Sequence, residues 1–132
     1  MAFGLTASRK KIIYVDDMNT SLKNFKKALE AHYEIFLADS IDKMNKIMGK
    51  IKPDLILLDV NMPDTSGFEI IKKLKDDERH NDIPVIFMTS SGDKDSVEEG
   101  LSLGAVAYVV KPFNALKLVE TINNQLYPKE NA

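Results

Sequence analysis

The chain alternates short apolar runs with longer segments in which apolar residues recur every three or four positions. The short runs are rich in aliphatic and β-branched residues, which favours strands; they cover Ile12–Val15, Tyr33–Leu37, Asp54–Leu58, Val85–Met88 and Ala107–Val110. Some of these runs are apolar at every position, as is typical of strands that helices cover on both faces. The pattern therefore predicts a parallel sheet between two layers of helices.

The segments between these runs carry helix signals. Apolar residues lie at helical spacing in five groups: Leu22, Phe25 and Leu29; Ile41, Met44 and Met48; Phe68, Ile71 and Leu74; Val97 and Leu101; Val119, Ile122 and Leu126. Asp93 and Asn114 are suited to begin the last two helices, Gly49 and Gly104 to end the second and fourth in a left-handed conformation, and Pro128 to stop the fifth. Repeated strand–helix units with right-handed connections predict a doubly wound, three-layer α/β fold.

Composition limits the classes of protein to consider. The length of 132 residues with 44% hydrophobic content fits one domain, which we expect over residues 11–127, between an N-terminal extension (1–10) and a tail or linker start (128–132). A net charge of −2 without a basic stripe argues against direct nucleic-acid binding, and the lack of cysteine excludes disulfides and thiol chemistry. No segment resembles a signal peptide or a membrane span, so we expect a cytoplasmic protein without membrane contact.

Polar residues of defined chemistry follow four of the predicted strands. Asp16 and Asp17 follow the first, Asp59 the third, Thr89 the fourth and Lys111 the fifth. Taken singly, each has a structural explanation as a helix cap, a turn former or a strand end. Since the carboxyl ends of parallel strands meet at one edge of the sheet, where such folds bind ligands, we expect all five side chains to form one site.

Three carboxylates in one site repel one another, so the site must take up a proton or a cation. Mg²⁺ fits because it prefers oxygen ligands and keeps several waters; Mn²⁺ is also possible. Asp59 can then act as a nucleophile on phosphorus, with Lys111 stabilising charge on the transferred oxygens and Thr89 donating a hydroxyl. The sequence therefore predicts a site for phosphoryl transfer to an aspartate.

With these site residues, the sequence resembles the receiver domains of bacterial two-component response regulators. The matching residues, in order and spacing, are Asp16-Asp17, Leu58-Asp59-Val60-Asn61-Met62-Pro63, Gly67, Thr89 and Lys111-Pro112. The resemblance spans about residues 11–127 and implies a flavodoxin-like strand order 2-1-3-4-5. It also implies a signalling domain instead of an enzyme, which phosphorylates itself from small donors and dephosphorylates itself.

The resemblance further assigns roles and partners. Asp59 is the phosphoacceptor, Asp17 binds Mg²⁺ directly, Asp16 mainly through water, and Asn61 through its backbone carbonyl. Thr89 and Tyr108 are the switch pair. A sensor histidine kinase or a histidine phosphotransfer protein supplies the phosphoryl group, and the fourth helix, fifth strand and fifth helix contact an output domain or partner, with a phosphorylation-dependent dimer possible. We also predict a cis Lys111–Pro112 peptide, which aims the lysine into the site.

Two positions depart from the commonest family pattern: Met18, where a third acidic residue is frequent, and Ser90, where alanine is frequent. The main alternative function is a Mg²⁺-dependent phosphatase with an aspartate nucleophile. Such enzymes use a second carboxyl group as a general acid, whereas Asn61 stands at that position here. A flavin or nucleotide carrier is disfavoured because the acidic loop after the first strand would repel a phosphate. Whether the domain acts alone or within a longer regulator stays open.

Overall fold

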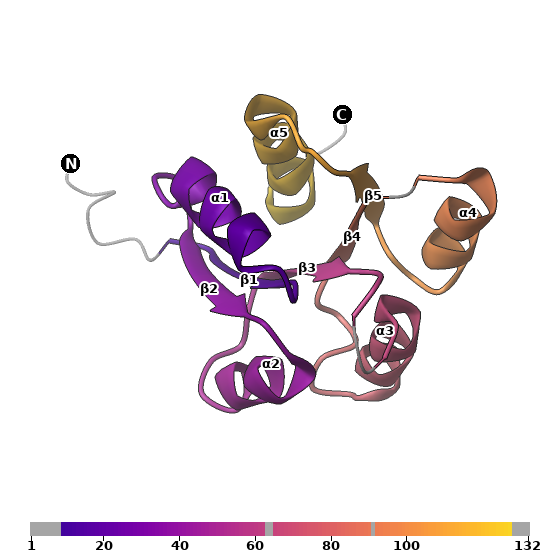
Figure 1. Cartoon of the computed structure of the whole chain (residues 1–132). Coiled ribbons are helices and arrows are strands. Elements are labelled where there is room, and N and C mark those ends of the chain that lie inside the picture. The colour runs from indigo at the N-terminus through magenta and orange to yellow at the C-terminus, as the bar shows by residue number, and fades with distance from the viewer. Residues whose placement is uncertain (1–8, 63–64, 91, 128–132) are drawn as a thin grey trace.

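The computed structural model describes residues 9–62, 65–90 and 92–127. Over these ranges five parallel strands form one sheet: β1 (Lys11–Val15), β2 (Glu34–Ala38), β3 (Leu55–Asp59), β4 (Val85–Thr89) and β5 (Ala107–Val110). The helices between and after them are α1 (Asn19–Leu29), α2 (Ile41–Met48), α3 (Gly67–Asp76), α4 (Lys94–Ser102) and α5 (Ala115–Leu126). The strand order is β2-β1-β3-β4-β5, which confirms the predicted doubly wound fold (Figure 1).

Helices cover both faces of the sheet. Figure 1 shows α1 and α5 on one face and α2, α3 and α4 on the other. Successive residues of each strand point to opposite faces of the sheet. In β1, Ile13 and Val15 pack toward α2 and α3, whereas Ile12 and Tyr14 pack toward α1 and α5. Every residue of β3 and β4 is buried, which explains why these runs are apolar almost throughout.

Three predicted strand starts differ from the structure by one residue. The first strand begins one residue earlier than predicted, at Lys11, whereas β2 and β3 begin one residue later. Tyr33 is buried but precedes β2, because its N–H bonds to the carbonyl of Leu29 and closes the end of α1. Asp54 precedes β3, and its side chain accepts a 2.8 Å hydrogen bond from the N–H of Lys11. At their other ends β2, β3 and β4 run one residue further than predicted, so Asp59 and Thr89 are the last residues of their strands.

Helix boundaries largely agree with the sequence signals. The side chains of Asp93 and Asn114 accept hydrogen bonds from the N–H groups of Ser96 and Lys117, so both residues cap their helices as predicted, and Gly104 has the expected left-handed φ of 113°. The prediction for Gly49 was wrong in one respect: it ends α2 with φ of −74°, a right-handed value open to any residue.

The buried face of α4 also differs from the expectation. Leu101, expected on its apolar face, is 44% exposed, and Gly100 is the buried residue of this helix. A Cβ atom at Gly100 would lie 2.9 Å from the ring of Phe87 and 3.1 Å from that of Tyr108, so the missing side chain lets α4 approach the sheet.

Some predictions fall on residues that the structure does not describe. These are most of the N-terminal extension (1–8), Pro63 of the quoted motif, the stop at Pro128 and the rest of the tail. Within the described ranges, no helix combines the length and hydropathy needed to cross a bilayer.

Candidate functional site

The carboxyl ends of four strands bring the predicted polar residues together. Asp16 and Asp17 follow β1, Asp59 ends β3, Thr89 ends β4 and Lys111 follows β5. The register of β3 with β1 and β4 aligns Leu58 with Val15 and Asp59 with Met88. Strand pairing alone therefore holds these positions at one edge of the sheet. The Lys111–Pro112 peptide is cis, as predicted.

Asp16 is the most enclosed group of the site, with none of its surface exposed. Its Oδ2 atom accepts two short hydrogen bonds of 2.6 Å, one from the Tyr14 hydroxyl and one from Lys111 Nζ. Its Oδ1 atom accepts the N–H of Met18 at 2.9 Å. Both carboxylate oxygens thus have partners, as a buried charge requires.

Asp59 is 6% exposed and is held more loosely than Asp16. Its Oδ1 atom accepts the N–H of Asn61 at 3.0 Å, and its Oδ2 atom lies 3.6 Å from Lys111 Nζ. Burial raises the pKa of Asp59 above its ordinary value; the N–H of Asn61 and the charge of Lys111 lower it, while Asp16 and Asp17 raise it further. A positive charge added beside Asp59 would favour its ionised form.

The three aspartates could hold such a charge. One oxygen from each of Asp16, Asp17 and Asp59 lies within 4.8 Å of the others, and Asp17 is open to solvent. Three convergent carboxylates suit a hard divalent cation, for which Asp17 offers the most accessible ligand. The donor set therefore fits the predicted Mg²⁺ or Mn²⁺ ion.

Gly67 lies close against the end of β3. The N–H of Gly67 bonds to the carbonyl of Val60 at 2.7 Å, and Asn61 pairs with Ser66 in an isolated antiparallel bridge. A Cβ atom at Gly67 would lie 2.7 Å from the carbonyl oxygen of Asp59. Since no side chain fits there, the absence of a Cβ atom lets α3 begin directly against the end of β3.

Thr89 and Tyr108 lie on neighbouring strands beside this site. Thr89 is 1% exposed, and its backbone carbonyl accepts the N–H of Lys111 at 2.7 Å. The ring of Tyr108 packs edge-on against Phe87, with centroids 5.8 Å apart. The Tyr108 hydroxyl is buried without a well-formed hydrogen bond to the described residues. Burial raises the pKa of Tyr108, the negative charge of Asp93 raises it further, and Thr89 lowers it.

Comparisons with known proteins agree with this geometry. The sequence profile of the response regulator receiver domain matches residues 12–123. The chain belongs to this family. This match favours a signalling domain over a phosphatase or a flavin or nucleotide carrier. Members of the family interact with histidine kinases and output domains.

Individual relatives of the receiver domain differ in length. This chain is 41% identical over 111 residues to the phosphate regulon transcriptional regulatory protein PhoB of Pseudomonas aeruginosa, and the match covers 83% of this chain but only 48% of PhoB. It is 36% identical over 121 residues to the polar-differentiation response regulator DivK of Brucella ovis, covering 89% of this chain and 96% of DivK. The chain therefore spans about half of one relative and nearly all of the other.

Among solved structures, the receiver domain is similar to the chemotaxis protein CheY4 of Vibrio cholerae. The two superpose with a TM-score of 0.84 at 29% identity, over 90% of this chain and 100% of CheY4. This likeness agrees with the strand order and the layer arrangement of the fold.

Tyr14 is the residue of the receiver domain's site that sequence reasoning missed. It was assigned only to an apolar strand, yet its hydroxyl reaches the buried Asp16. Burial and the neighbouring Asp16 raise the pKa of Tyr14 far above its ordinary value, so the hydroxyl stays protonated and acts as a donor. One signal was present in the sequence: residues two apart in a strand point to the same face, which places Tyr14 beside Asp16.

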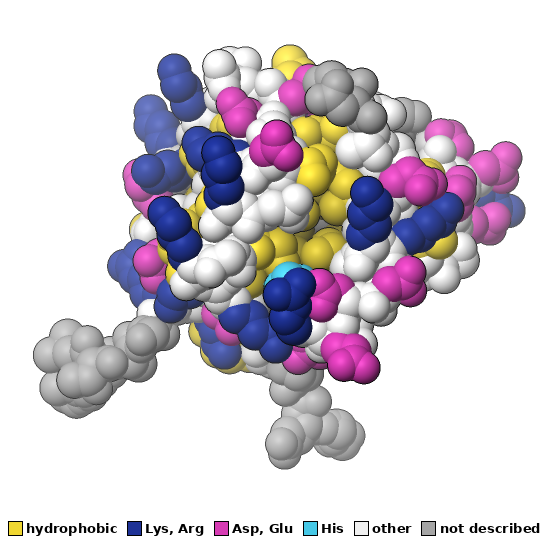
Figure 2. Space-filling view, turned by 90° about the horizontal axis from the view of Figure 1, so that it is seen from below, with side chains coloured by type: hydrophobic (Ala, Val, Ile, Leu, Met, Phe, Trp, Pro, Cys, Tyr) yellow, Lys and Arg dark blue, Asp and Glu magenta, His cyan; other side chains and the backbone are white. Residues whose placement is uncertain are grey.

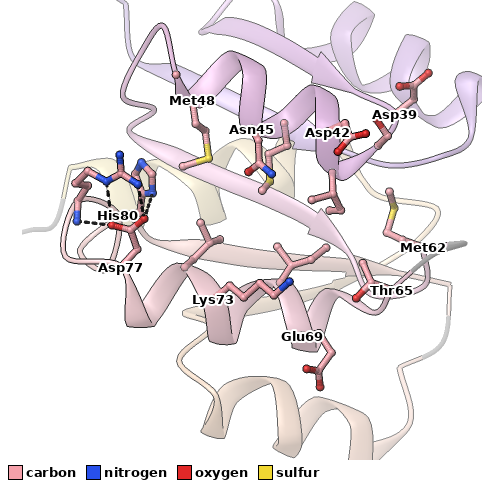
Figure 3. A pocket seen from close by; sticks show the side chains of 17 residues that line it. Asp39, Asp42, Asn45, Met48, Met62, Thr65, Glu69, Lys73, Asp77 and His80 are labelled. Atoms are coloured by element: carbon pink, nitrogen blue, oxygen red, sulfur yellow. Dashed lines mark hydrogen bonds and ion pairs between the residues drawn. The ribbon is translucent and has the colours of Figure 1, made fainter.

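A groove of about 520 Å³ lies between α2 and α3, and none of Asp16, Asp17 and Asp59 lines it (Figure 3). Its apolar lining includes Met44, Met48, Met62, Ile70 and Leu74. Figure 2 shows hydrophobic surface exposed on this side of the molecule, bordered by charged side chains. Asp16, Asp59 and Lys111 do not line the groove, so it is not part of the site described above.

Proposed function

We propose that Asp59 accepts a phosphoryl group and that this modification switches the output surface of the receiver domain. The observation that carries the proposal is the placement of Asp59 beside both a cation, Lys111, and an acidic pair, Asp16 and Asp17, with the N–H of Asn61 donating to its Oδ1 atom. Such a site orients a carboxylate while leaving it in reach of positive charge.

In the proposed reaction, a carboxylate oxygen of Asp59 forms a bond to phosphorus. The phosphorus–nitrogen bond of a phosphohistidine on a sensor kinase or phosphotransfer protein breaks, and the imidazole keeps the electron pair and takes up a proton. With acetyl phosphate the phosphorus–oxygen bond breaks instead, and acetate leaves. Lys111, 3.6 Å from Asp59 Oδ2, is placed to neutralise charge on the phosphoryl oxygens. Later hydrolysis of the acyl phosphate resets the domain.

Asp16, Asp17, Asp59 and the backbone carbonyl of Asn61 would hold Mg²⁺ or Mn²⁺. The bound ion would supply charge neutralisation and alignment for the incoming phosphoryl group. A direct role for Asp17 is supported by its exposure, and an indirect role for Asp16 by the three hydrogen bonds that already occupy its oxygens.

The proposed output surface comprises α4, β5 and α5, next to the switch pair Thr89 and Tyr108. Large exposed hydrophobic residues on these elements support a role in contact: Leu101 (44% exposed), Val110 (47%) and Leu116 (83%), with Val106 (39%) directly before β5. The partner is an output domain, a separate protein or a second phosphorylated copy. The inward movement of the Thr89 hydroxyl toward the phosphoryl group would bias the rotamer of Tyr108 and thereby this surface.

Incubation with acetyl phosphate and Mg²⁺, followed by intact mass measurement, tests the proposal. We expect one added phosphoryl group on the wild-type protein and on Asp95→Asn, an exposed control on α4, but none on Asp59→Asn. Equal modification of Asp59→Asn and the wild type would refute the proposal.

A further inference from the structure

Tyr14 and Lys111 share one oxygen atom of a completely buried carboxylate. Both donate to Asp16 Oδ2 at 2.6 Å, and the same lysine lies 3.6 Å from Asp59 Oδ2. Lys111 therefore hydrogen-bonds to Asp16 and forms a longer ion pair with Asp59. If Lys111 is to contact a phosphoryl group on Asp59, it must give up at least part of its bond to Asp16.

That exchange has a cost that depends on what remains on Asp16. A buried carboxylate oxygen that loses its only donor is strongly destabilised, whereas an oxygen that keeps one short hydrogen bond is not left bare. The Tyr14 hydroxyl donates to Asp16 Oδ2 independently of Lys111, so movement of the lysine does not remove this donor. Its bond to Asp16 Oδ2 would therefore be kept if the lysine moved toward Asp59.

We propose that Tyr14 is a positioning residue for phosphoryl transfer, which holds Asp16 so that Lys111 can move from Asp16 to the phosphoryl oxygens on Asp59. The inference rests on the proposed function of Asp59. Tyr14 itself touches neither the phosphoryl donor nor Asp59; it acts through the carboxylate it shares with the lysine.

Packing holds the Tyr14 ring in the orientation that this role requires. The ring is completely buried and lies against Phe25 of α1, with centroids 4.4 Å apart. Phe25 in turn contacts Phe113, two residues after Lys111, with centroids 6.1 Å apart. The aromatic contacts thus connect the segment that follows Lys111 with Tyr14.

Tyr14→Phe tests the inference because it removes the hydroxyl and keeps the ring. Without the hydroxyl, Lys111 is the sole donor to Asp16 Oδ2 and should stay there. We expect the maximal rate of phosphorylation by acetyl phosphate to fall about tenfold, the size of effect typical of one charged hydrogen bond. Mg²⁺ affinity, measured by calorimetry, should be unchanged or tighter, because Asp16 has lost a competing donor.

Tyr33→Phe is the matched control. Tyr33 is also buried, at 3% exposure, and its hydroxyl donates to Asn123 Oδ1 at 2.7 Å, away from the carboxylates. Its loss should leave both the rate and the Mg²⁺ affinity within twofold of wild type. Rates are compared at a temperature at which circular dichroism shows both variants to be folded; the phenylalanine ring keeps the packing against Phe25.

A double-mutant cycle with Asp16→Asn separates positioning from a general loss of structure. If Tyr14 acts through the Asp16 carboxylate, Tyr14→Phe should slow phosphorylation less than twofold in the Asp16→Asn background. An equal slowing in both backgrounds, an unchanged rate in Tyr14→Phe, or a parallel fall of rate and Mg²⁺ affinity would overturn the inference. Failure of the wild-type protein to become phosphorylated would instead overturn the proposed function.

Discussion

Lys111 Nζ lies 2.6 Å from Oδ2 of Asp16 but 3.6 Å from Oδ2 of Asp59. The cation that the sequence assigned to the phosphoryl site is thus bound to the neighbouring carboxylate. Its side chain is only partly accessible, at 16%, so this pair is little screened by solvent. The arrangement keeps a positive charge near the proposed nucleophile without neutralising it fully.

Replacing Lys111 by methionine should therefore affect Asp59 as well as Asp16. We expect phosphorylation by acetyl phosphate to slow about 100-fold, since a charged group at the transferred oxygens is lost. Because Lys111 lowers the pKa of Asp59, its loss should also move the acid limb of the pH–rate profile to higher pH. Lys117→Met, on the exposed side of α5, is the control. A wild-type rate in Lys111→Met would contradict this role.

Asp59→Asn should stabilise the metal-free protein at neutral pH. The folded-state pKa of Asp59 is raised, mainly by burial, so the ionised carboxylate opposes folding, and its unfavourable effect appears as pH rises through that pKa. The variant should unfold at a higher temperature than wild type at neutral pH, and the difference should shrink as pH falls below the ordinary carboxyl range. Asp95→Asn should show no such dependence. A lower melting temperature for Asp59→Asn at neutral pH would show that burial does not strain this carboxylate.

Gly67→Ala should destabilise the fold by about 1–3 kcal/mol, the usual cost of overpacking, despite the better helix propensity of alanine. The added Cβ would lie 2.7 Å from the carbonyl oxygen of Asp59 and 3.0 Å from Phe87. Gly49→Ala is the matched control, because its nearest neighbours would be 3.5 Å away and its φ of −74° suits any residue. Urea unfolding curves compare the two. Equal free energies of unfolding for the two variants would mean that the backbone at the end of β3 shifts to accommodate the added Cβ atom without loss of stability.

Thr89→Ala should separate phosphorylation from its consequence. The variant keeps the backbone hydrogen bond between residue 89 and Lys111, so it should still accept a phosphoryl group on Asp59. It lacks the hydroxyl that is proposed to move toward this phosphoryl group. Hydrogen exchange of α4 and β5 should change on phosphorylation of the wild type and stay constant in Thr89→Ala. Thr121→Ala removes a hydroxyl that bonds within α5 and should behave as wild type. The same exchange response in Thr89→Ala would refute the coupling.

The sequence predicted the strand order, through the family resemblance, and the grouping of the polar residues, because parallel strands must place their carboxyl ends together. It did not predict the partners of Asp16. A tyrosine in an apolar strand is explained by packing alone, and whether its hydroxyl reaches a carboxylate depends on a rotamer set by Phe25 of another element. The buried Gly100 was missed for a similar reason, since it reflects the distance of α4 from Phe87 and Tyr108.

The location of the acyl phosphate tests the central claim most directly. After incubation with acetyl phosphate, borohydride reduction converts a phosphorylated aspartate to homoserine, and peptide mass analysis identifies its position. We predict homoserine at Asp59 alone, formed with Mg²⁺ present and absent when a chelator removes it. Homoserine at Asp16 or Asp17, or equal labelling of Asp59 in the presence of the chelator, would contradict the account.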